Sequence, residues 1–293
     1  MARTPTAKQT NSVLLQGNKL YQQRARLTLP YLVRQAKAGK PIYYSVLAEE
    51  LGMPNARNLN YPLGTIGNAL STLSKQLAAS IPPIQCVVVN KTTNLPGEGI
   101  GWFITKKDYS QLSKVEKKRI VDLALVEIYN YPHWDWVLEE LALAPVPALT
   151  EEDLTGAGTM GGGGESESHR KFKEFIALNP HVVGLDGLND GKMEVILPSA
   201  DKLDVLFLDG KVKIGIEVKS ILSGRLDIIR GMFQCVKYKH LIEAEQKVKN
   251  EYPKSRVILA LQGPLPPDLL SVKNVLGVEV VDNIEIIQPL NHS

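Results

Sequence analysis

Hydrophobic spacing in the C-terminal part of the chain predicts a helix, three strands, and then a helix and a strand twice over. In ESHRKFKEFIALNP, Phe172, Phe175 and Ile176 recur at the three-and-four spacing of a helix. Strands are predicted in KMEVIL, KLDVLFLDG and KVKIGIEVK, and the Asp-Gly pair between the last two is a hairpin signal. A long helix over 225–248 precedes strand SRVILALQG, helix PPDLLSVKNVL and strand GVEVVD. This order fits a mixed sheet flanked by helices.

The N-terminal part shows helical patterns separated by short extended runs. LPYLVRQAKAGKPIYYSVLAEELGMP predicts a helix, a short strand at PIYY, and a second helix opened by Ser45. A third helix, LGTIGNALSTLSKQLAAS, carries one apolar stripe, formed by Ile66, Ala69, Leu70, Leu73 and Leu77. IPPIQCVVVN then predicts a strand before the glycine-rich TTNLPGEGIGWF. Three helices followed by a hairpin is a winged-helix order, in which the third helix usually enters the major groove.

A change of composition separates the two parts, at APVPALTEEDLTGAGTMGGGGESES, residues 144–168. Proline, glycine and small polar residues replace the apolar periodicity there, and four consecutive glycines are costly to hold in a helix or a strand. We therefore expect an N-terminal domain over 1–145, a flexible linker over 146–165, and a C-terminal domain over 166–293.

Composition narrows the class of protein. The 293 residues are 44% hydrophobic and 22% charged, which suits globular domains. A formal charge of +3 permits a nucleic-acid partner but does not argue for one, because only clustered charge would. Cys86 and Cys235 are too few and too far apart for a disulfide framework, and no histidine pair has zinc spacing, so His169 is expected to be an ordinary helix residue. Without a signal-peptide core or a membrane span, a cytoplasmic protein is expected.

Two of the predicted strands carry charged residues where buried positions are expected. Asp204 lies within the apolar run LDVLF, and Glu217 and Lys219 flank Val218 at the end of KIGIEVK. Side chains alternate along a strand, so Glu217 and Lys219 point to the same side. Two carboxylates where a sheet splays suit Mg²⁺ or Mn²⁺, and an adjacent lysine suits phosphodiester hydrolysis. We expect Asp204 and Glu217 to be metal ligands, with the carbonyl of Val218 nearby.

The spacing of these residues resembles the PD-(D/E)XK nucleases, which share the restriction-endonuclease-like fold. The parallel is an acid at Asp204, a short hairpin, and Glu-x-Lys in EVK over 217–219, although Leu203 stands where many members have proline. The resemblance covers about residues 166–285. It implies metal-dependent cleavage of DNA, with the aspartate, the glutamate and the lysine as catalytic residues.

The long predicted helix adds to this resemblance. Arg230, Gln234 and Tyr238 recur every four residues and so share one helix face. A glutamine with a tyrosine four residues later is similar to an extra motif of many of these nucleases, in which the glutamine holds the nucleophilic water or the lysine. The resemblance thus implies a catalytic Gln234, with Arg230 and Tyr238 toward DNA. It also implies an acid on the first helix, where both Glu167 and Glu174 qualify and Glu167 is preferred.

Residues 41–103 resemble the DNA-binding half of the alkylguanine-DNA alkyltransferases, in YSVLAEELGMP, IGNAL, IPPIQCVVVN and GEGIGW. That family's reactive cysteine lies in Pro-Cys-His-Arg-Val, where this chain reads Pro-Ile-Gln-Cys-Val from Pro83 onward. The family's base-flipping arginine is also missing, with Gly64 nearest to that position. The resemblance therefore implies a DNA-binding shape without alkyl transfer. Cys86 as an alkyl acceptor lacks any sequence neighbour that would lower its pKa.

The segment RNLNYP is an insertion relative to that family. Its polar residues are candidates for DNA contact and, equally, for an ordinary loop between two helices. Aromatic and amide groups there could stack on or read an extruded base. The candidates are Arg57, Asn58, Asn60 and Tyr61.

Together these patterns predict an α/β protein with a winged-helix-like α+β recognition domain and a nuclease core of restriction-endonuclease-like mixed sheet flanked by helices. The expected function is metal-dependent endonucleolytic cleavage of double-stranded DNA, set by family analogy in restriction or defence against foreign DNA. Two alternatives stay open: a non-catalytic DNA-binding or damage-recognition protein with a degenerate nuclease fold, and cleavage of RNA, or of DNA only within a partner complex. The sequence also leaves open a homodimer or a larger defence complex.

Overall fold

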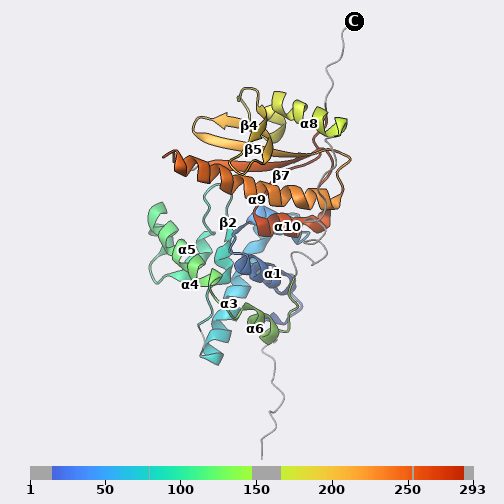
Figure 1. Ribbon diagram of the computed structural model, residues 1–293. Helices are drawn as coiled ribbons and strands as arrows, with labels where there is room; N and C mark the ends of the chain where they lie inside the picture. Colours follow the sequence, from blue (N-terminus) through green and yellow to red (C-terminus); the bar gives the residue numbers. More distant parts are fainter. Residues whose placement is uncertain (1–14, 79, 147–165, 253, 287–293) are drawn as a thin grey trace, which may run out of the picture. The chain divides into compact units, whose positions relative to one another are not determined.

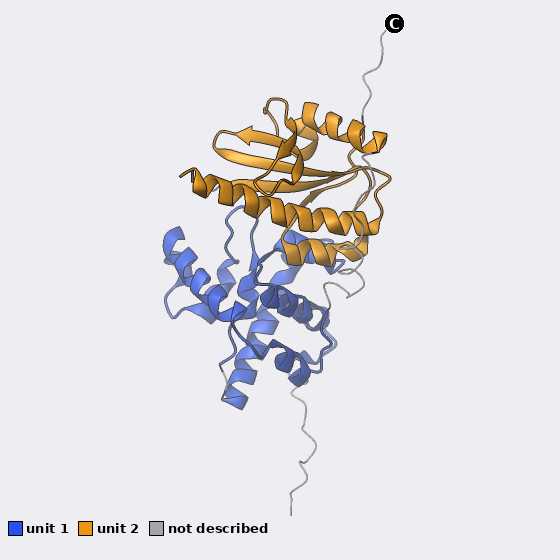
Figure 2. Cartoon of the chain, in the orientation of Figure 1, with its two compact units in different colours: residues 1–148 blue, residues 149–293 orange. Residues whose placement is uncertain are grey.

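The computed structural model describes residues 15–78, 80–146, 166–252 and 254–286 (Figure 1). The chain divides into two compact units, residues 1–148 and 149–293 (Figure 2). The described chain is mixed α and β, and the expected linker over 146–165 lies outside the described residues except for Val146. Among the helices of these residues, none has the length and apolar character needed to cross a bilayer.

Unit 1 is built on two long helices in contact, α1 (Leu20–Lys37) and α3 (Asn60–Leu77). A short parallel strand pair, β1 (Ile42–Tyr43) with β2 (Val88–Val89), and helix α2 (Tyr44–Glu50) lie beside them. Other elements of the unit are η2 (Ala56–Leu59), η3 (Ile84–Val87), η4 (Glu98–Ile100), α4 (Gly101–Ile104), η5 (Tyr109–Gln111), α5 (Lys114–Tyr129) and α6 (Trp134–Glu140). One hydrophobic core joins the inward faces of these elements.

The apolar stripe of α3 explains how the helix is held. Ile66, Ala69, Leu70 and Leu73 are buried as expected, because residues three and four apart share a helix face. Leu77, in the last turn, is exposed. Helix α2 begins at Tyr44 without a side-chain cap, so the prediction that Ser45 opens it is wrong.

The expected hairpin after α3 is not formed within residues 80–146. The segment around Pro83 forms the 3-10 helix η3, and its strand β2 is short and pairs in parallel with β1. Proline has no N–H to give to a ladder, which keeps a strand from starting earlier. The glycine-rich segment that follows forms η4 and α4 instead of a second strand. The hairpin prediction is therefore wrong.

Unit 2 contains a five-stranded sheet within its described residues, in the order β3-β4-β5-β6-β7. β3, β4 and β5 are antiparallel neighbours, and β6 and β7 continue the sheet in parallel with β5. The strands are β3 (Lys192–Ile196), β4 (Lys202–Asp209), β5 (Val212–Lys219), β6 (Ser255–Leu261) and β7 (Glu279–Val281). The helical elements are α8 (Glu167–Leu178), η6 (Pro180–Val183), α9 (Arg225–Val248), η7 (Pro267–Leu269) and α10 (Leu270–Leu276). The predicted order of helices and strands is confirmed.

Two hydrophobic clusters lie on the two faces of this sheet. α8 packs with the cluster that contains Ile216 and Val218 of β5, whereas α9 packs with the cluster that contains Leu259 of β6. Because side chains alternate along β5, Glu217 and Lys219 fall on the face that α9 covers. The sheet thus places two charged residues beneath a helix.

A glycine lets α9 come close to that face. A Cβ added to Gly231 would lie 2.8 Å from Cδ1 of Leu259 and 2.8 Å from Cε of Lys219. Real Cβ atoms do not approach heavy atoms so closely, so an alanine here would have to displace the side chains of Leu259 and Lys219.

We expect Gly231→Ala to destabilise unit 2 by about 1–3 kcal/mol, because overpacking outweighs the gain in helix propensity. Gly64→Ala in α3 is the matched control: no atom lies within 4 Å of its added Cβ, so propensity alone should stabilise unit 1 by up to about 1 kcal/mol. Calorimetry measures both effects, and tryptophan fluorescence identifies the unit 1 transition, since all three tryptophans (102, 134 and 136) lie there. A Gly231→Ala protein as stable as the wild type would contradict the close packing.

Candidate functional site

Strands β4 and β5 separate where the candidate carboxylate lies. Their backbone pairing runs from Asp209–Val212 to Val205–Ile216. Beyond that point the N–H of Val218 donates to Oδ2 of Asp204 at 2.8 Å, so a side chain takes the place of the next backbone partner. The N–H and C=O of a residue in an extended strand point to the same side, which directs the carbonyl of Val218 toward β4 as well. Asp204 therefore contacts Val218 on the side of β5 toward which the Val218 carbonyl also points.

Glu217 and Lys219 form a buried ion pair on the α9 side of β5. Nζ of Lys219 donates to Oε1 of Glu217 at 2.7 Å, and Glu217 is only 3% exposed. Burial raises the pKa of Glu217 to about 7, against the lowering effect of Lys219, and the nearby Asp204 carboxylate raises it further. The negative charge of Glu217 is therefore only partly compensated by its neighbours in the free protein.

The face of α9 predicted from four-residue spacing reaches the same place. Oε1 of Gln234 accepts a hydrogen bond from Nζ of Lys219 at 3.3 Å, and Nε2 of Gln234 donates to the hydroxyl of Tyr238 at 3.1 Å. Tyr238 is buried, and burial raises the pKa of its hydroxyl. Its predicted role in DNA contact is therefore wrong for this structure: Tyr238 positions Gln234, which in turn positions Lys219. Arg230 lines the cavity that opens beside these residues.

Helix α8 presents a histidine to the site rather than an acid. Nε2 of His169 lies 3.6 Å from Oδ1 of Asp204. Glu167, the preferred candidate, is exposed and pairs with Lys171 at 2.7 Å, and Glu174 pairs with Arg170 at 2.8 Å. The structure therefore does not bring Glu167 or Glu174 to the carboxylates.

The sequence held a signal for His169. The buried stripe of α8 contains Phe172 and Ile176, and a step of three residues back along the stripe arrives at position 169. Ser166 caps the helix through the N–H of His169 at 3.2 Å, which fixes this first turn. Glu167 lies off the stripe, so periodicity separates the two residues without any structure.

A cavity of about 580 Å³ opens over these groups. It is lined by residues of α8, β3, β4, the end of β5 and the start of α9, and three of the lining residues are serines. The lining residues are Ser166, His169, Lys173, Glu194, Lys202, Asp204, Lys219, Ser220, Leu222, Ser223, Asp227 and Arg230. The arrangement combines carboxylate oxygens with several cations, which suits a metal ion and a phosphate together.

The donor set meets the needs of a magnesium ion. Among the described residues, no group of three or more His, Cys, Asp and Glu side chains is arranged to hold a metal. Mg²⁺ keeps several waters and takes one or two carboxylates together with substrate phosphate. Asp204, buried Glu217 and the carbonyl of Val218 supply that smaller set, and a dication would offset both the burial of the Glu217 charge and its repulsion by Asp204, which raise the pKa of Glu217. The residues therefore fit Mg²⁺ or Mn²⁺.

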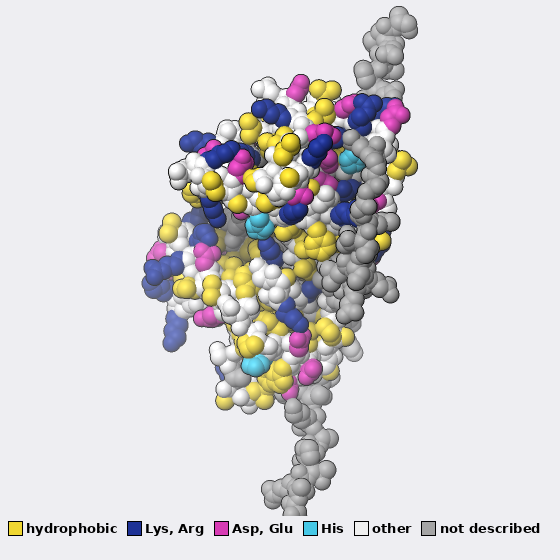
Figure 3. All heavy atoms as spheres, viewed as in Figure 1, with side chains coloured by type: hydrophobic (Ala, Val, Ile, Leu, Met, Phe, Trp, Pro, Cys, Tyr) yellow, Lys and Arg dark blue, Asp and Glu magenta, His cyan; other side chains and the backbone are white. Residues whose placement is uncertain are grey.

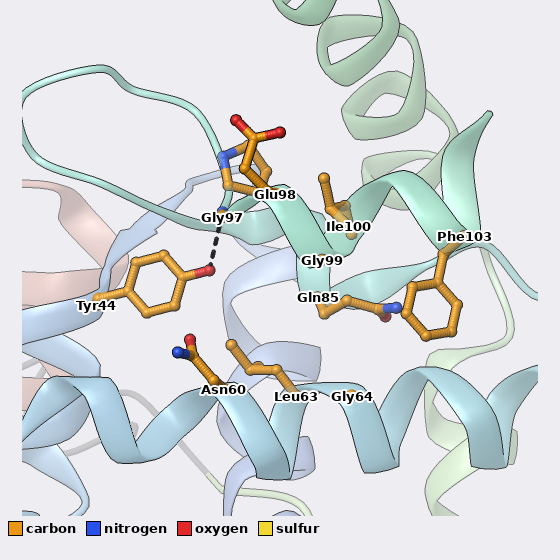
Figure 4. A pocket seen from close by; sticks show the side chains of 11 residues that line it. Tyr44, Asn60, Leu63, Gly64, Gln85, Gly97, Glu98, Gly99, Ile100 and Phe103 are labelled. Atoms are coloured by element: carbon orange, nitrogen blue, oxygen red, sulfur yellow. Dashed lines mark hydrogen bonds between the residues drawn. The ribbon is translucent and has the colours of Figure 1, made fainter. Parts of the chain in front are cut away.

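Unit 1 contains a second candidate site, a cavity of about 410 Å³ between the start of α3 and the glycine-rich segment (Figure 4). Gln85 lies in it beside the ring of Phe103, and its side chain is 5% exposed overall. Neither amide atom of Gln85 has a hydrogen-bond partner within the described chain. The hydroxyl of Tyr44 accepts the N–H of Gly97 at 3.1 Å and closes one wall. A buried amide without partners costs about 1–3 kcal/mol, so the cavity is built around an unmet donor and acceptor.

Of the predicted DNA-contacting residues, Asn60 lines this cavity. The RNLNYP segment is not a loop, because Arg57 and Asn58 lie in η2 and Asn60 and Tyr61 begin α3. All four side chains are exposed, and Asn60 lines the cavity. The expectation of an irregular loop is wrong, whereas the exposure that DNA contact requires is present.

Cys86 follows Gln85 but takes no part in the cavity. It is fully buried, and burial raises the pKa of its thiol to about 12. A thiol in this state is a poor nucleophile, which agrees with the absence of alkyl-transfer chemistry expected from the sequence. Cys86 and Cys235 are both free thiols.

Comparison with protein-family models, with curated proteins and with solved structures finds no match to this chain. The two sites are therefore interpreted from their own geometry.

Proposed function

We propose that the protein is a metal-dependent nuclease that hydrolyses phosphodiester bonds of double-stranded DNA. The observation that carries the proposal is the position of Lys219, whose ammonium group is held by Glu217 at 2.7 Å and by Gln234 at 3.3 Å at the base of a cavity lined by Asp204. Burying this ion pair in an otherwise apolar sheet costs desolvation free energy. Apolar residues would fold the sheet at a lower cost, so stability alone does not explain the pair.

Each residue of the site has a distinct task. Asp204 and Glu217 would hold a divalent cation, which when bound supplies Lewis acidity toward a phosphate oxygen and the nucleophilic water. Lys219 donates to the charge that develops on the phosphate or orients the water. Gln234 fixes the ammonium group of Lys219, and Tyr238 fixes Gln234. His169 faces Asp204, with Nε2 lying 3.6 Å from Oδ1, and lies beside that carboxylate in the cavity lining.

The cavity in unit 1 supports a role in DNA recognition. A nucleobase is a planar ring that presents neighbouring donors and acceptors, and a glutamine amide pairs with such an edge in both directions, as with adenine. Gln85 offers both groups unpaired, Asn60 lines the same cavity, and Arg57 and Tyr61 are exposed nearby in the sequence. We propose that unit 1 receives an extruded base, which requires unstacking of the duplex.

The face shown in Figure 3 carries lysine and arginine side chains interspersed with aspartate and glutamate rather than one broad basic field. Binding would therefore depend on local cations at the two sites, and restriction or defence against foreign DNA is the proposed setting. The alternative, a non-catalytic DNA-binding protein, predicts binding that does not depend on Lys219.

Lys219→Ala should lower the rate of DNA cleavage in Mg²⁺ by about 10²–10³-fold or more, because the ammonium group acts on the transition state. DNA affinity measured in Ca²⁺ should change little. Lys249→Ala, which removes an exposed lysine paired with Glu245, is the control. If wild type and Lys219→Ala cleave equally, or neither cleaves, the catalytic proposal fails.

Divalent cations should stabilise unit 2 without DNA, by about 1.4–2.7 kcal/mol at 10–100 times the dissociation constant. Asp204→Asn should abolish that rise in melting temperature because one ligand charge is lost. Asp209→Asn, at the exposed far end of the same strand, should keep it. Differential scanning calorimetry with Ca²⁺ or Mg²⁺ measures the shift, and an unchanged response of Asp204→Asn would exclude Asp204 as a ligand.

Gln85→Leu should change stability and binding in opposite directions. Removal of the unpaired amide should stabilise unit 1 or leave it unchanged, whereas affinity for a duplex with one unpaired adenine should fall by about 1–3 kcal/mol. Fluorescence anisotropy of the cleavage-deficient Lys219→Ala protein compares this duplex with a fully paired one. Arg57→Ala should instead reduce the salt dependence of the binding affinity equally for both duplexes. Equal affinities for Gln85→Leu and its parent would rule out base reading.

A further inference from the structure

Three charged side chains lie in the unit 2 cavity beside the proposed catalytic groups. Lys173 comes from α8, Glu194 from β3 and Lys202 from the start of β4, and all three line the cavity that Asp204 and Lys219 also line. Nζ of Lys173 lies 2.9 Å from Oε1 of Glu194, and Nζ of Lys202 lies 3.3 Å from Oε2. One carboxylate thus bridges two ammonium groups that belong to different elements.

The backbone of Glu194 has an unusual conformation. Its φ is +53°, in the left-handed region that costs a non-glycine residue about 1 kcal/mol or more. β3 and β4 are registered at Met193–Val205 and at Val195–Leu203, which leaves Glu194 opposite Asp204 in the ladder. The distortion therefore occurs at the position that faces the candidate metal ligand.

The charges of the bridge are unequal. Lys173 is only 5% exposed, and a buried ammonium group must be compensated. Hydrogen bonds from Lys173 first, and then from Lys202, lower the pKa of Glu194, so this carboxylate stays ionised. Two cations share one carboxylate, and the side chain of Glu194 is 46% exposed, within reach of an incoming anion.

We propose that Lys173 and Lys202 form a second phosphate-binding subsite, which Glu194 occupies in the free protein as an internal substitute for the phosphate. The inference rests on the proposed nuclease function and adds the substrate contact next to the reacting phosphate. A phosphate of the bound strand displaces Glu194 from Lys202, and Lys173 gives the subsite its fixed position. The ligand chemistry is a phosphate group, supplied either by the neighbouring phosphodiester or by a terminal phosphate monoester.

A purely structural role predicts a different outcome. If the bridge only clamps α8 to β3 and β4, loss of the Glu194 charge would lower the melting temperature and leave DNA affinity unchanged. A subsite blocked by its own carboxylate instead binds DNA more tightly when that carboxylate is neutralised, because Glu194 then no longer competes with phosphate for Lys202.

The test is the affinity of the full chain for duplex DNA in Ca²⁺, where binding is measured without cleavage. Glu194→Gln keeps an acceptor for Lys173 but removes the charge, and should tighten binding by about 3–10-fold. Lys202→Gln should weaken binding by about 3–10-fold and reduce the slope of log affinity against log salt by about 0.9. The double variant Glu194→Gln/Lys202→Gln should show none of the tighter DNA binding of Glu194→Gln, because the Glu194 carboxylate acts by occupying Lys202.

Matched controls separate this effect from a change of net charge. Glu279→Gln, on β7, removes a carboxylate of similar exposure, 44%, that pairs with Arg256 of β6, and Lys249→Gln removes an exposed paired lysine just after the end of α9. Glu194→Gln binding no tighter than Glu279→Gln, or Lys202→Gln binding as well as Lys249→Gln, would overturn the subsite. If Glu194→Gln fails to fold, the exposed Lys202 decides the question alone.

The form of the DNA distinguishes the two phosphate sources. If the two variants change the affinity for a closed circular duplex as much as for a linear one, the subsite binds an internal phosphodiester. Effects confined to linear duplexes with a 5′-phosphate, and absent with a 5′-hydroxyl, assign it to a terminal phosphate. Failure of the nuclease proposal appears separately, as a wild-type protein that binds DNA but does not cleave it in Mg²⁺.

Discussion

The burial of Glu217 is the constraint on which the site in unit 2 depends. A carboxylate placed under a helix loses its hydration, and the pKa of about 7 shows that Lys219 restores only part of that loss. The pair is shielded from water because α9 passes close to it, which Gly231 permits. Gln234 accepts a second hydrogen bond from the ammonium group of Lys219. The helix, its glycine and its glutamine are thus consequences of one buried charge.

The separation of β4 from β5 completes the arrangement from the other side. A continuous ladder would satisfy the N–H of Val218 with a backbone carbonyl and leave no room for a side chain. Because Asp204 accepts that N–H instead, its carboxylate is fixed at the end of the paired region with the other oxygen directed toward His169. An apolar sheet therefore presents two acids at one point without a long loop to hold them, which favours a precise site on rigid elements.

Periodicity predicted unit 2 well because long elements carry many repeats of their pattern. The bounds of α9, 225–248, and the placing of Gln234 and Tyr238 on one face followed from spacing alone. Spacing does not give depth, so it could not show that Tyr238 is buried behind Gln234. Glu167 was preferred for its chemistry, although the helix stripe pointed to His169. In unit 1 the hairpin failed because β1, distant in sequence, pairs in parallel with β2, and such a partner leaves no local signal.

The two candidate sites share a physical feature that argues for ligands rather than for stability. Glu217 is buried with incomplete charge compensation, and Gln85 is buried with an unpaired amide. A Cβ at Gly67 would lie 2.3 Å from Nε2 of Gln85, so the chain uses a glycine to admit a side chain that its own fold does not satisfy. An apolar residue at either position would lower the cost of folding. Polar groups kept under such a cost fit the two proposals above, in which a cation binds at Glu217 and a hydrogen-bonding ring at Gln85.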